Sequence, residues 1–289
     1  MSGSSIGKNF TVTTWGESHG KAIGVVIDGC PAGLPLCEED IQKDLDRRRP
    51  GQSPYSTPRN EEDMVNILSG TFEGITTGTP ISLIIYNHDQ RSKDYSQIAN
   101  VYRPGHADYT YHQKYGIWDY RGGGRASGRE TAARVAAGAV AKKILSRLGV
   151  KILAYTLSIG PVKIEPEYFD ENEIYKNPLA MPDRKAFQKA AEYIEQMKEK
   201  GDSTGGVVEC MINGLPCGVG EPVFEKLDAV LGKAILSIGA VKGIEFGRGF
   251  GAAFTTGSQN NDPLTYIQNK GLVKETNNSG GITGGISEG

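Results

Sequence analysis

The chain has 289 residues, of which 38% are hydrophobic and 23% are charged, and its formal net charge at pH 7 is −2. This composition is typical of a globular protein with a large core. The small net charge argues against a nucleic acid or a membrane surface as partner, because such partners select basic surfaces. Apolar runs stay far below the ~18 residues of a membrane span, and the N-terminal sequence MSGSSIGKNF has no signal pattern, so we expect a cytoplasmic protein.

Glycine and cysteine usage sets two further limits. The chain holds 39 glycines, about twice the typical ~7% share, and they fall between helix and strand patterns, which favours turns and close backbone approaches. The four cysteines form two equally spaced pairs, Cys30 with Cys37 and Cys210 with Cys217. That spacing is wider than in zinc sites, so we expect reduced, half-buried thiols and no metal.

Mixed α and β structure is predicted along the chain. β-Branched residues bounded by glycine or proline predict strands at residues 10–15, 23–28, 80–86, 151–159 and 206–211. Helix patterns occur at residues 38–47, 129–148, 183–200 and 222–236. Ser127 and Glu130 have capping-box spacing before the second helix, and Gly149 and Gly201 are placed to end the second and third. Pro222 suits the first position of the fourth helix.

An internal echo relates two parts of the chain. The sequences GESHGKAIGVVIDGCPAGLPL, from Gly16, and GDSTGGVVECMINGLPCGVG, from Gly201, both run from a glycine turn through a valine-rich strand and G-L-P toward a helix. We predict two similar halves, at about residues 10–150 and 200–289, within a single domain covering residues 1–289; chance similarity is the alternative. The second half is shorter and stops in a glycine-rich stretch, so either the two halves are unequal or a C-terminal segment is missing.

Histidine is scarce, and two of the four lie in turns. His19 stands between glycines in GESHG, beside Ser18. Neighbours in sequence usually cannot make the Ser–His contact of a hydrolase triad, so we do not expect these two side chains to bond. His106 lies near Arg103 in RPGHADYTYH, where a structural histidine in an aromatic cluster is the alternative. Imidazole titrates near physiological pH and suits general acid–base work.

Three groups of arginines indicate an anionic ligand. DLDRRRPG places Arg47, Arg48 and Arg49 at a helix end, where favourable capping is the alternative to bidentate binding of phosphate or carboxylate. Arg103 forms the second group with its neighbouring turn. YRGGGRASGRE joins three glycines, several arginines and a helix start, a favourable setting for phosphate, and matches neither a P-loop nor a dinucleotide motif. These residues predict proton transfer on a polyanionic small molecule.

The motifs together resemble the chorismate synthase family. They are GESHGKAIGVVIDGCPAGLPL, DLDRRRPG, RPGHADYTY, YRGGGRASGRETAARVAAGAVAKK and GEPVFEKLDAVLGKAILSIGAVKGIEFG, in order along essentially the whole chain. The resemblance implies an α+β fold, a β-α-β sandwich of central helices flanked by antiparallel-rich sheets, with internal duplication. It also implies a lyase that converts 5-enolpyruvylshikimate 3-phosphate to chorismate and phosphate by 1,4-elimination, the last common step of the shikimate pathway for aromatic amino acid biosynthesis.

The resemblance further implies partners and residue roles. Reduced FMN would be the cofactor, with NADPH only the indirect source of flavin reduction, and the enzyme would be a homotetramer. His19 would donate a proton to the departing phosphate, and His106 would protonate or polarise the reduced flavin. The implied substrate contacts are Ser18, Arg48, Arg103 and Arg129. The implied flavin contacts are Arg125, Ala126, Ser127, Gly239, Ala240 and Gly284.

Two departures from the family pattern bear on activity. Many members have an arginine where this chain has Pro54, and Arg59 is a possible substitute. Members also continue past the equivalent of Gly289 with a lysine-proline-threonine flavin loop and an Arg-His-Asp-Pro segment. We therefore expect this chain to bind its ligands weakly or to have impaired activity.

Two competing function classes can be separated by experiment. A metal-free phosphohydrolase using His19 as nucleophile would form a phosphohistidine and ignore flavin. A phospho-ligand or RNA-binding module would bind in a strongly salt-dependent way and tolerate substitution of His19 and His106. The acidic balance of the chain counts against the second class.

Overall fold

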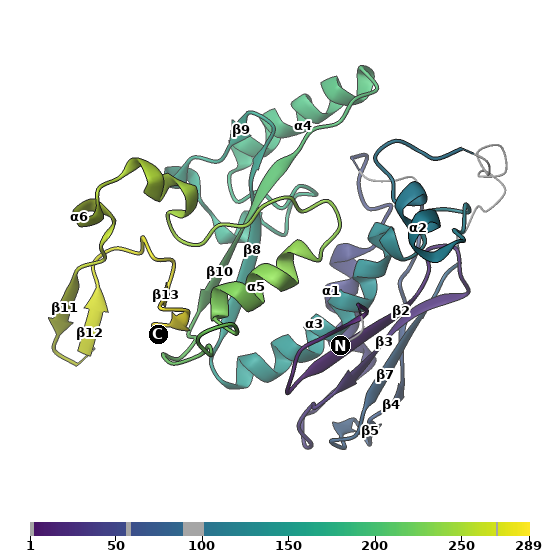
Figure 1. Cartoon of the computed structure of the whole chain (residues 1–289), viewed down its shortest axis with the longest axis horizontal. Helices are drawn as coiled ribbons and strands as arrows, with labels where there is room; N and C mark the ends of the chain where they lie inside the picture. Colours follow the sequence, from purple (N-terminus) through teal and green to yellow (C-terminus); the bar gives the residue numbers. More distant parts are fainter. Residues whose placement is uncertain (1–2, 56–58, 89–100, 270) are drawn as a thin grey trace. The chain divides into compact units, whose positions relative to one another are not determined.

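The computed structural model describes residues 3–55, 59–88, 101–269 and 271–289. The chain divides into two compact units, Met1–Asn213 and Gly214–Gly289 (Figure 1). The first unit contains the GESHG turn and all three arginine groups, and the second begins just after the last long strand. Within the described residues, every helix is too short or too polar to cross a bilayer.

A five-stranded antiparallel sheet forms the base of the first unit. Its order is β1-β2-β3-β7-β4, with β1 at Ser5–Ile6, β2 at Thr11–Gly16, β3 at Ala22–Asp28, β7 at Ile81–Tyr86 and β4 at Val65–Ser69. β7 buries alternate residues, Ile81, Leu83 and Ile85, which is the pattern of a strand with one face on the core. The central strand β3 is buried along almost its whole length.

Helices α1, Glu38–Arg48, and α3, Thr131–Arg147, cover one face of this sheet (Figure 1). α3 presents small side chains to the strands, and its buried residues are Ala132, Ala133, Ala136, Ala137, Ala139 and Val140. Small side chains let the helix approach the sheet closely. α1 adds Ile41 and Leu45, which are fully buried in the same core. The shared core therefore fixes both α1 and α3 against the sheet.

A second sheet, of order β10-β8-β9, carries its own core. Its strands are β8 at Lys151–Ile159, β9 at Val162–Lys163 and β10 at Gly206–Asn213, all paired antiparallel. Helix α4, Arg184–Glu199, begins at Asp183, whose carboxylate accepts hydrogen bonds from the first-turn amides. Tyr155, Ile174, Met181 and Ala190 are buried here. The first unit therefore holds two separate apolar clusters.

The remaining elements are short. In the first unit they are β5 at Thr71–Phe72, β6 at Ile75–Thr76 and α2 at Asp108–Tyr115. The second unit contains α5 at Leu227–Leu236, α6 at Gly257–Asn260, the hairpin of β11 at Leu264–Ile267 with β12 at Gly271–Lys274, and that of β13 at Ile282–Thr283 with β14 at Ile286–Ser287. Short 3₁₀ turns lie at Gly124–Ala126, Gly128–Glu130, Pro166–Tyr168, Glu171–Glu173 and Gly249–Phe254.

The five predicted strands and four predicted helices are confirmed, with corrections at two helix starts. The fourth helix begins at Leu227 rather than Pro222, because Glu221 and Glu225 exchange backbone hydrogen bonds that hold this stretch in a turn. The capping box before the second helix is only half formed. Ser127 accepts from the amide of Arg129, but the Glu130 carboxylate is used elsewhere, by the Thr14 hydroxyl and by Arg134.

Two smaller expectations have different outcomes. Gly149 and Gly201 end their helices in left-handed backbone, at φ +79° and +66°, as predicted. The four thiols are free, but they are not half-buried: Cys30 is buried and the other three are exposed. Cys210 lies on β10, a strand that is exposed along nearly its whole length. The two predicted halves stay a prediction.

We expect Leu45→Ala to destabilise the first unit by about 2–5 kcal/mol, because it removes a fully buried side chain between α1 and the core. The exposed neighbour Lys43 gives the control, Lys43→Ala, expected within about 0.5 kcal/mol of the parent. Urea unfolding followed by tryptophan fluorescence measures both, because Trp15 and Trp118 are the only tryptophans of the chain and both lie in this unit. Equal stabilities would contradict the assigned core.

Candidate active site

The GESHG turn connects β2 to β3 and brings its two polar side chains together. The amide of Gly20 donates to the carbonyl of Glu17 over 3.1 Å and closes the turn. Ser18 is buried, and its Oγ lies 3.1 Å from Nδ1 of His19. The expectation that these neighbours would not bond is therefore wrong, because the sharp turn lets both side chains fold to the same side.

Two side chains from distant parts of the sequence clamp this turn. Nδ2 of Asn87, just past β7, donates to the carbonyls of Glu17 and Gly20 over 3.1 and 2.9 Å. Nη1 of Arg59 donates to the carbonyl of Ser18 over 3.1 Å. Three carbonyls of a four-residue turn are thus fixed by side chains. His19 is held in place by its backbone as well as by its own contacts.

Glycine is required where the RGGGR loop meets this imidazole. Gly122 has φ +139°, and a Cβ there would lie 2.4 Å from Nδ1 of His19, far inside van der Waals contact. Its carbonyl accepts a 3.1 Å hydrogen bond from Nη2 of Arg103. Arg103 also makes a bidentate pair with Asp108, at 2.8 Å from Nε and from Nη2. The second and third arginine groups therefore meet at His19.

A buried carboxylate joins the other two predicted substrate arginines. The Asp63 side chain is fully buried and pairs with Nη1 of Arg48 at 2.7 Å and with Nη1 of Arg129. Nε of Arg129 donates to Oδ1 of Asn87 over 2.9 Å, and its buried Nη2 has no hydrogen-bond partner among the described residues. One carboxylate faces two guanidiniums, so the cluster carries excess positive charge and a buried donor that lacks an acceptor.

The surrounding charges set the protonation of His19. Burial, followed by the positive charge of Arg59, lowers the pKa of His19 below its ordinary 6.5. Arg121 and Arg103 act in the same direction, and Asp119 opposes them. The imidazole is therefore biased toward its neutral form by cations that an anionic ligand would neutralise.

The first unit also shows where the other predicted site residues lie. His106 is exposed in the turn before α2, and its Nδ1 donates to the carbonyl of Pro104 over 3.1 Å. Arg125 donates to the carbonyls of Thr14 and Gly16 and to the Thr14 hydroxyl, so its guanidinium fastens the end of β2. Ala126 is exposed beside it, and Ser127 Oγ caps the following turn.

Gly239, Ala240 and Gly284 belong to the second unit. Gly239 and Ala240 follow α5, and Ala240 has left-handed backbone at φ +69°. Gly284 lies in the turn between β13 and β14 at φ +63°. A Cβ at Gly239 or Gly284 would meet no heavy atom within 4 Å, so both turns leave open space beside the backbone.

Sequence reasoning missed three residues that organise the site. Asp63 lies in an acidic loop, EEDM, that reads as a solvated surface, and Asn87 is one polar residue after a strand. Gly122 is one of the three glycines of the predicted phosphate-binding loop, and the sequence does not show its approach to His19. A polar residue directly after a buried strand was the available signal for Asn87. The other two depend on long-range packing.

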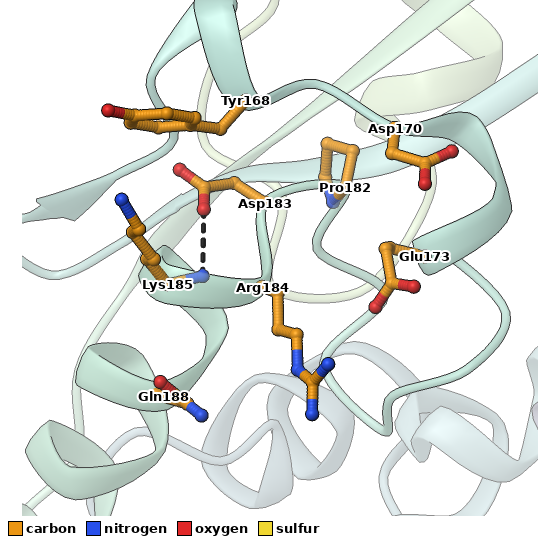
Figure 2. Close-up of a pocket in the computed structure, with 8 residues that line it drawn as sticks. All are labelled: Tyr168, Asp170, Glu173, Pro182, Asp183, Arg184, Lys185 and Gln188. Carbon is orange, nitrogen blue, oxygen red and sulfur yellow. Dashed lines mark hydrogen bonds between the residues drawn. The ribbon is translucent and has the colours of Figure 1, made fainter.

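A separate hollow of ≈ 430 Å³ lies at the start of α4 and includes none of the predicted site residues (Figure 2). Its polar groups are engaged in the fold: Asp183 accepts from the amide of Lys185 over 2.8 Å, and Lys185 Nζ lies 4.2 Å from the ring centroid of Tyr168. In the part of the chain that the structure describes, no group of three metal-ligating side chains is found. The GESHG turn and its arginines therefore form the best candidate site.

Comparison with known proteins identifies the family. The chain matches the family described as chorismate synthase over residues 10–289. It is 62% identical over 290 residues to the chorismate synthase of Agathobacter rectalis and 61% identical over 289 residues to that of Lachnoclostridium phytofermentans, covering 100% of this chain and 78% and 79% of those proteins. A crystal structure of chorismate synthase superposes with a TM-score of 0.82 at 36% identity, over 98% of this chain and 82% of the other.

This superposition confirms the predicted α+β fold, with its antiparallel sheets and packed helices. The match over nearly the whole chain, and the high identity to several relatives, settle the family. The chain belongs to the chorismate synthase family.

Proposed function

We propose that this chain catalyses the 1,4-elimination of phosphate from 5-enolpyruvylshikimate 3-phosphate, giving chorismate. In this reaction the carbon–oxygen bond to phosphate and a ring carbon–hydrogen bond break, and the ring gains a second double bond. The family is one of lyases in the shikimate pathway. The observation that carries the proposal is the buried Nη2 of Arg129, a donor without a partner among the described residues, one side chain away from the turn of His19.

The arginines supply what a substrate with one phosphate and two carboxylates needs. Arg48 and Arg129 share Asp63, so together they keep a net positive charge that an anion neutralises. A buried donor without an acceptor costs about 1–3 kcal/mol, and a ligand oxygen would recover this cost. Ser18 and Arg103 lie at the other side of His19 and complete the proposed substrate contacts.

His19 is the proposed proton donor to the departing phosphate. Leaving phosphate gains negative charge as its bond breaks, and an imidazolium beside it stabilises that charge. Without ligand, burial and then the neighbouring cations, Arg59 first, lower the pKa of His19. A bound phosphate reverses this effect, so the imidazole gains its proton when the leaving group is present.

Reduced FMN is the proposed cofactor, as the resemblance to the family implies. The proposed contacts are Arg125, Ala126 and Ser127 in the first unit and Gly239, Ala240 and Gly284 in the second. Open space at Gly239 and Gly284 allows the backbone to approach a ring closely. When bound, reduced FMN supplies electron density to the substrate without net redox change. His106, whose Nδ1 is occupied by a carbonyl, would present Nε2 to the flavin.

Three further assignments complete the proposal. Arg59 replaces the arginine that the family has at Pro54, because it reaches the Ser18 carbonyl and acts on His19. NADPH is the indirect source of flavin reduction, since the reaction itself consumes no reducing equivalents. The working enzyme is a cytoplasmic homotetramer, as the resemblance to the family implies. It binds neither nucleic acid nor membrane, a proposal that the small net charge supports.

An anaerobic assay with reduced FMN and the enolpyruvyl phosphate substrate tests the activity. We expect chorismate from the parent chain and a loss of about 10²–10⁴-fold in kcat for His19→Ala and for His106→Ala, because each removes a proton-transfer group. His112→Ala is the matched control, since His112 lies in α2 and bonds to the hydroxyl of Tyr102, outside the proposed machinery. Absence of chorismate from the parent chain would refute the proposed activity.

The pH dependence tests the role of His19. kcat/KM reports the free enzyme and kcat the complex, so we expect kcat/KM to fall at a lower pH than kcat as pH rises. The reason is that the pKa of His19 is lowered by burial and by Arg59 until phosphate neutralises the arginines. The pH profiles of kcat and kcat/KM for His19→Gln show the contribution of the substrate's own ionisation, because this variant lacks the imidazole. Coincident falls of the two parent profiles would argue against this coupling.

The tolerance of the glycine loop tests how closely His19 is packed. Gly122→Ala should lower kcat by about 10²-fold, because its Cβ would displace the imidazole. Gly124→Ala is the control: Gly124 also has a positive φ, +51°, but no heavy atom lies within 4 Å of a Cβ there. If both variants have the same kcat, the contact with His19 has no catalytic role.

A further inference from the structure

We propose that Asn87 is a positioning residue that couples the anion-binding guanidinium of Arg129 to the turn that carries His19. The inference rests on the proposed function, because it assigns Asn87 a part in the same site. Asn87 is buried, at 7% exposure, and its side-chain amide bonds both to the turn and to the guanidinium. Its effect is therefore exerted through His19 and Arg129.

The chemistry of its contacts fixes the orientation of the Asn87 amide. Arg129 can only donate, so Oδ1 must face it, and it accepts from Nε over 2.9 Å. The carbonyls of Glu17 and Gly20 can only accept, so Nδ2 must face them. The backbone amide of Asn87 also donates to the carbonyl of Lys21 over 3.1 Å. An amide is needed because one end must accept while the other donates twice.

This arrangement makes a continuous chain of contacts from anion to acid. Asp63 fixes one nitrogen of Arg129 and Asn87 fixes another, which leaves Nη2 for a ligand. The opposite end of Asn87 holds both ends of the turn on either side of His19. Removing the side chain would free the turn and take away one acceptor of Arg129, while every charge that faces His19 would stay: Arg59, Arg103, Arg121 and Asp119.

The chain offers a matched control in Asn177. Its Nδ2 also donates to two backbone carbonyls, of Glu173 and Met181, both over 2.8 Å, and its Oδ1 accepts from backbone amides. This clamp belongs to the loop before α4 and packs beside the second apolar cluster. Asn177→Ala removes the same kind of clamp without touching the GESHG turn, so it controls for lost stability.

The test combines turnover with NMR titration of the histidines on the full chain. Only four histidines are present, and His19→Gln assigns the signal of His19. In the parent we expect inorganic phosphate to raise the pKa of His19. In Asn87→Ala we expect that pKa to be higher before phosphate is added, because the released turn is less buried, and its response to phosphate to be smaller. kcat should fall about 10-fold to 100-fold, by more than KM rises.

The outcomes separate a positioning role from a structural one. Asn177→Ala should match the parent in kcat and in the titration of His19, even where its Tm is lower. If Asn87→Ala matches Asn177→Ala in both readouts, the proposal is overturned. If Asn87→Ala does not fold, Asn87→Ser replaces it: it adds no charge, loses both bonds that Nδ2 donates to the turn, and should also raise the pKa of His19. If the parent forms no chorismate, the proposed function fails, and the titration alone decides the role of Asn87.

Discussion

The site depends on one buried carboxylate that faces two guanidiniums. Asp63 sits in left-handed backbone at φ +52°, a conformation that is uncommon outside glycine, and both its oxygens are paired. Arg48 comes from the end of α1 and Arg129 from the turn that opens α3, so this carboxylate ties together the ends of two helices already fixed by the core. Removal of Asp63 would leave the buried guanidinium of Arg129 without its counter-charge, which typically costs about 3–5 kcal/mol.

A second set of cations, Arg59, Arg121 and Arg103, acts together with burial on the proposed acid His19. Arg48 and Arg129 share one carboxylate, so their site favours a further anion. Burial and the arginines around His19 disfavour protonation of its imidazole, and a bound anion would offset the charge of the arginines. Binding of phosphate and protonation of the imidazole are then mutually favourable, as linkage requires. The arrangement favours the neutral form of His19 in the empty site, and a bound anion would favour the charged form.

The sequence predicts the parts of the site but not their connections. GESHG, RRRPG and RGGGR are visible because glycines, arginines and a rare histidine stand out in composition, and strands and helices are visible through their periodicity. Asp63 and Asn87 have no such signal, since their roles arise from contacts with residues that are distant in the sequence. Ser18 and His19 are neighbours in sequence, which usually prevents a Ser–His contact, but the turn brings both side chains to the same side. Pro222 had the chemistry of a helix start, but backbone pairing of Glu221 with Glu225 decided the local structure.

Two asparagines in the first unit perform the same physical task, and the comparison shows where function begins. Asn87 and Asn177 each bridge two carbonyls with Nδ2, so each stabilises a turn that the chain alone would hold loosely. Oδ1 of Asn177 accepts from backbone amides two and four residues further along, so all these contacts stay within one loop. At Asn87 that oxygen faces a buried guanidinium with a nitrogen to spare. The two asparagines differ in what their Oδ1 contacts. Because Oδ1 of Asn87 contacts Arg129, its turn clamp links the proposed anion site to the turn of His19.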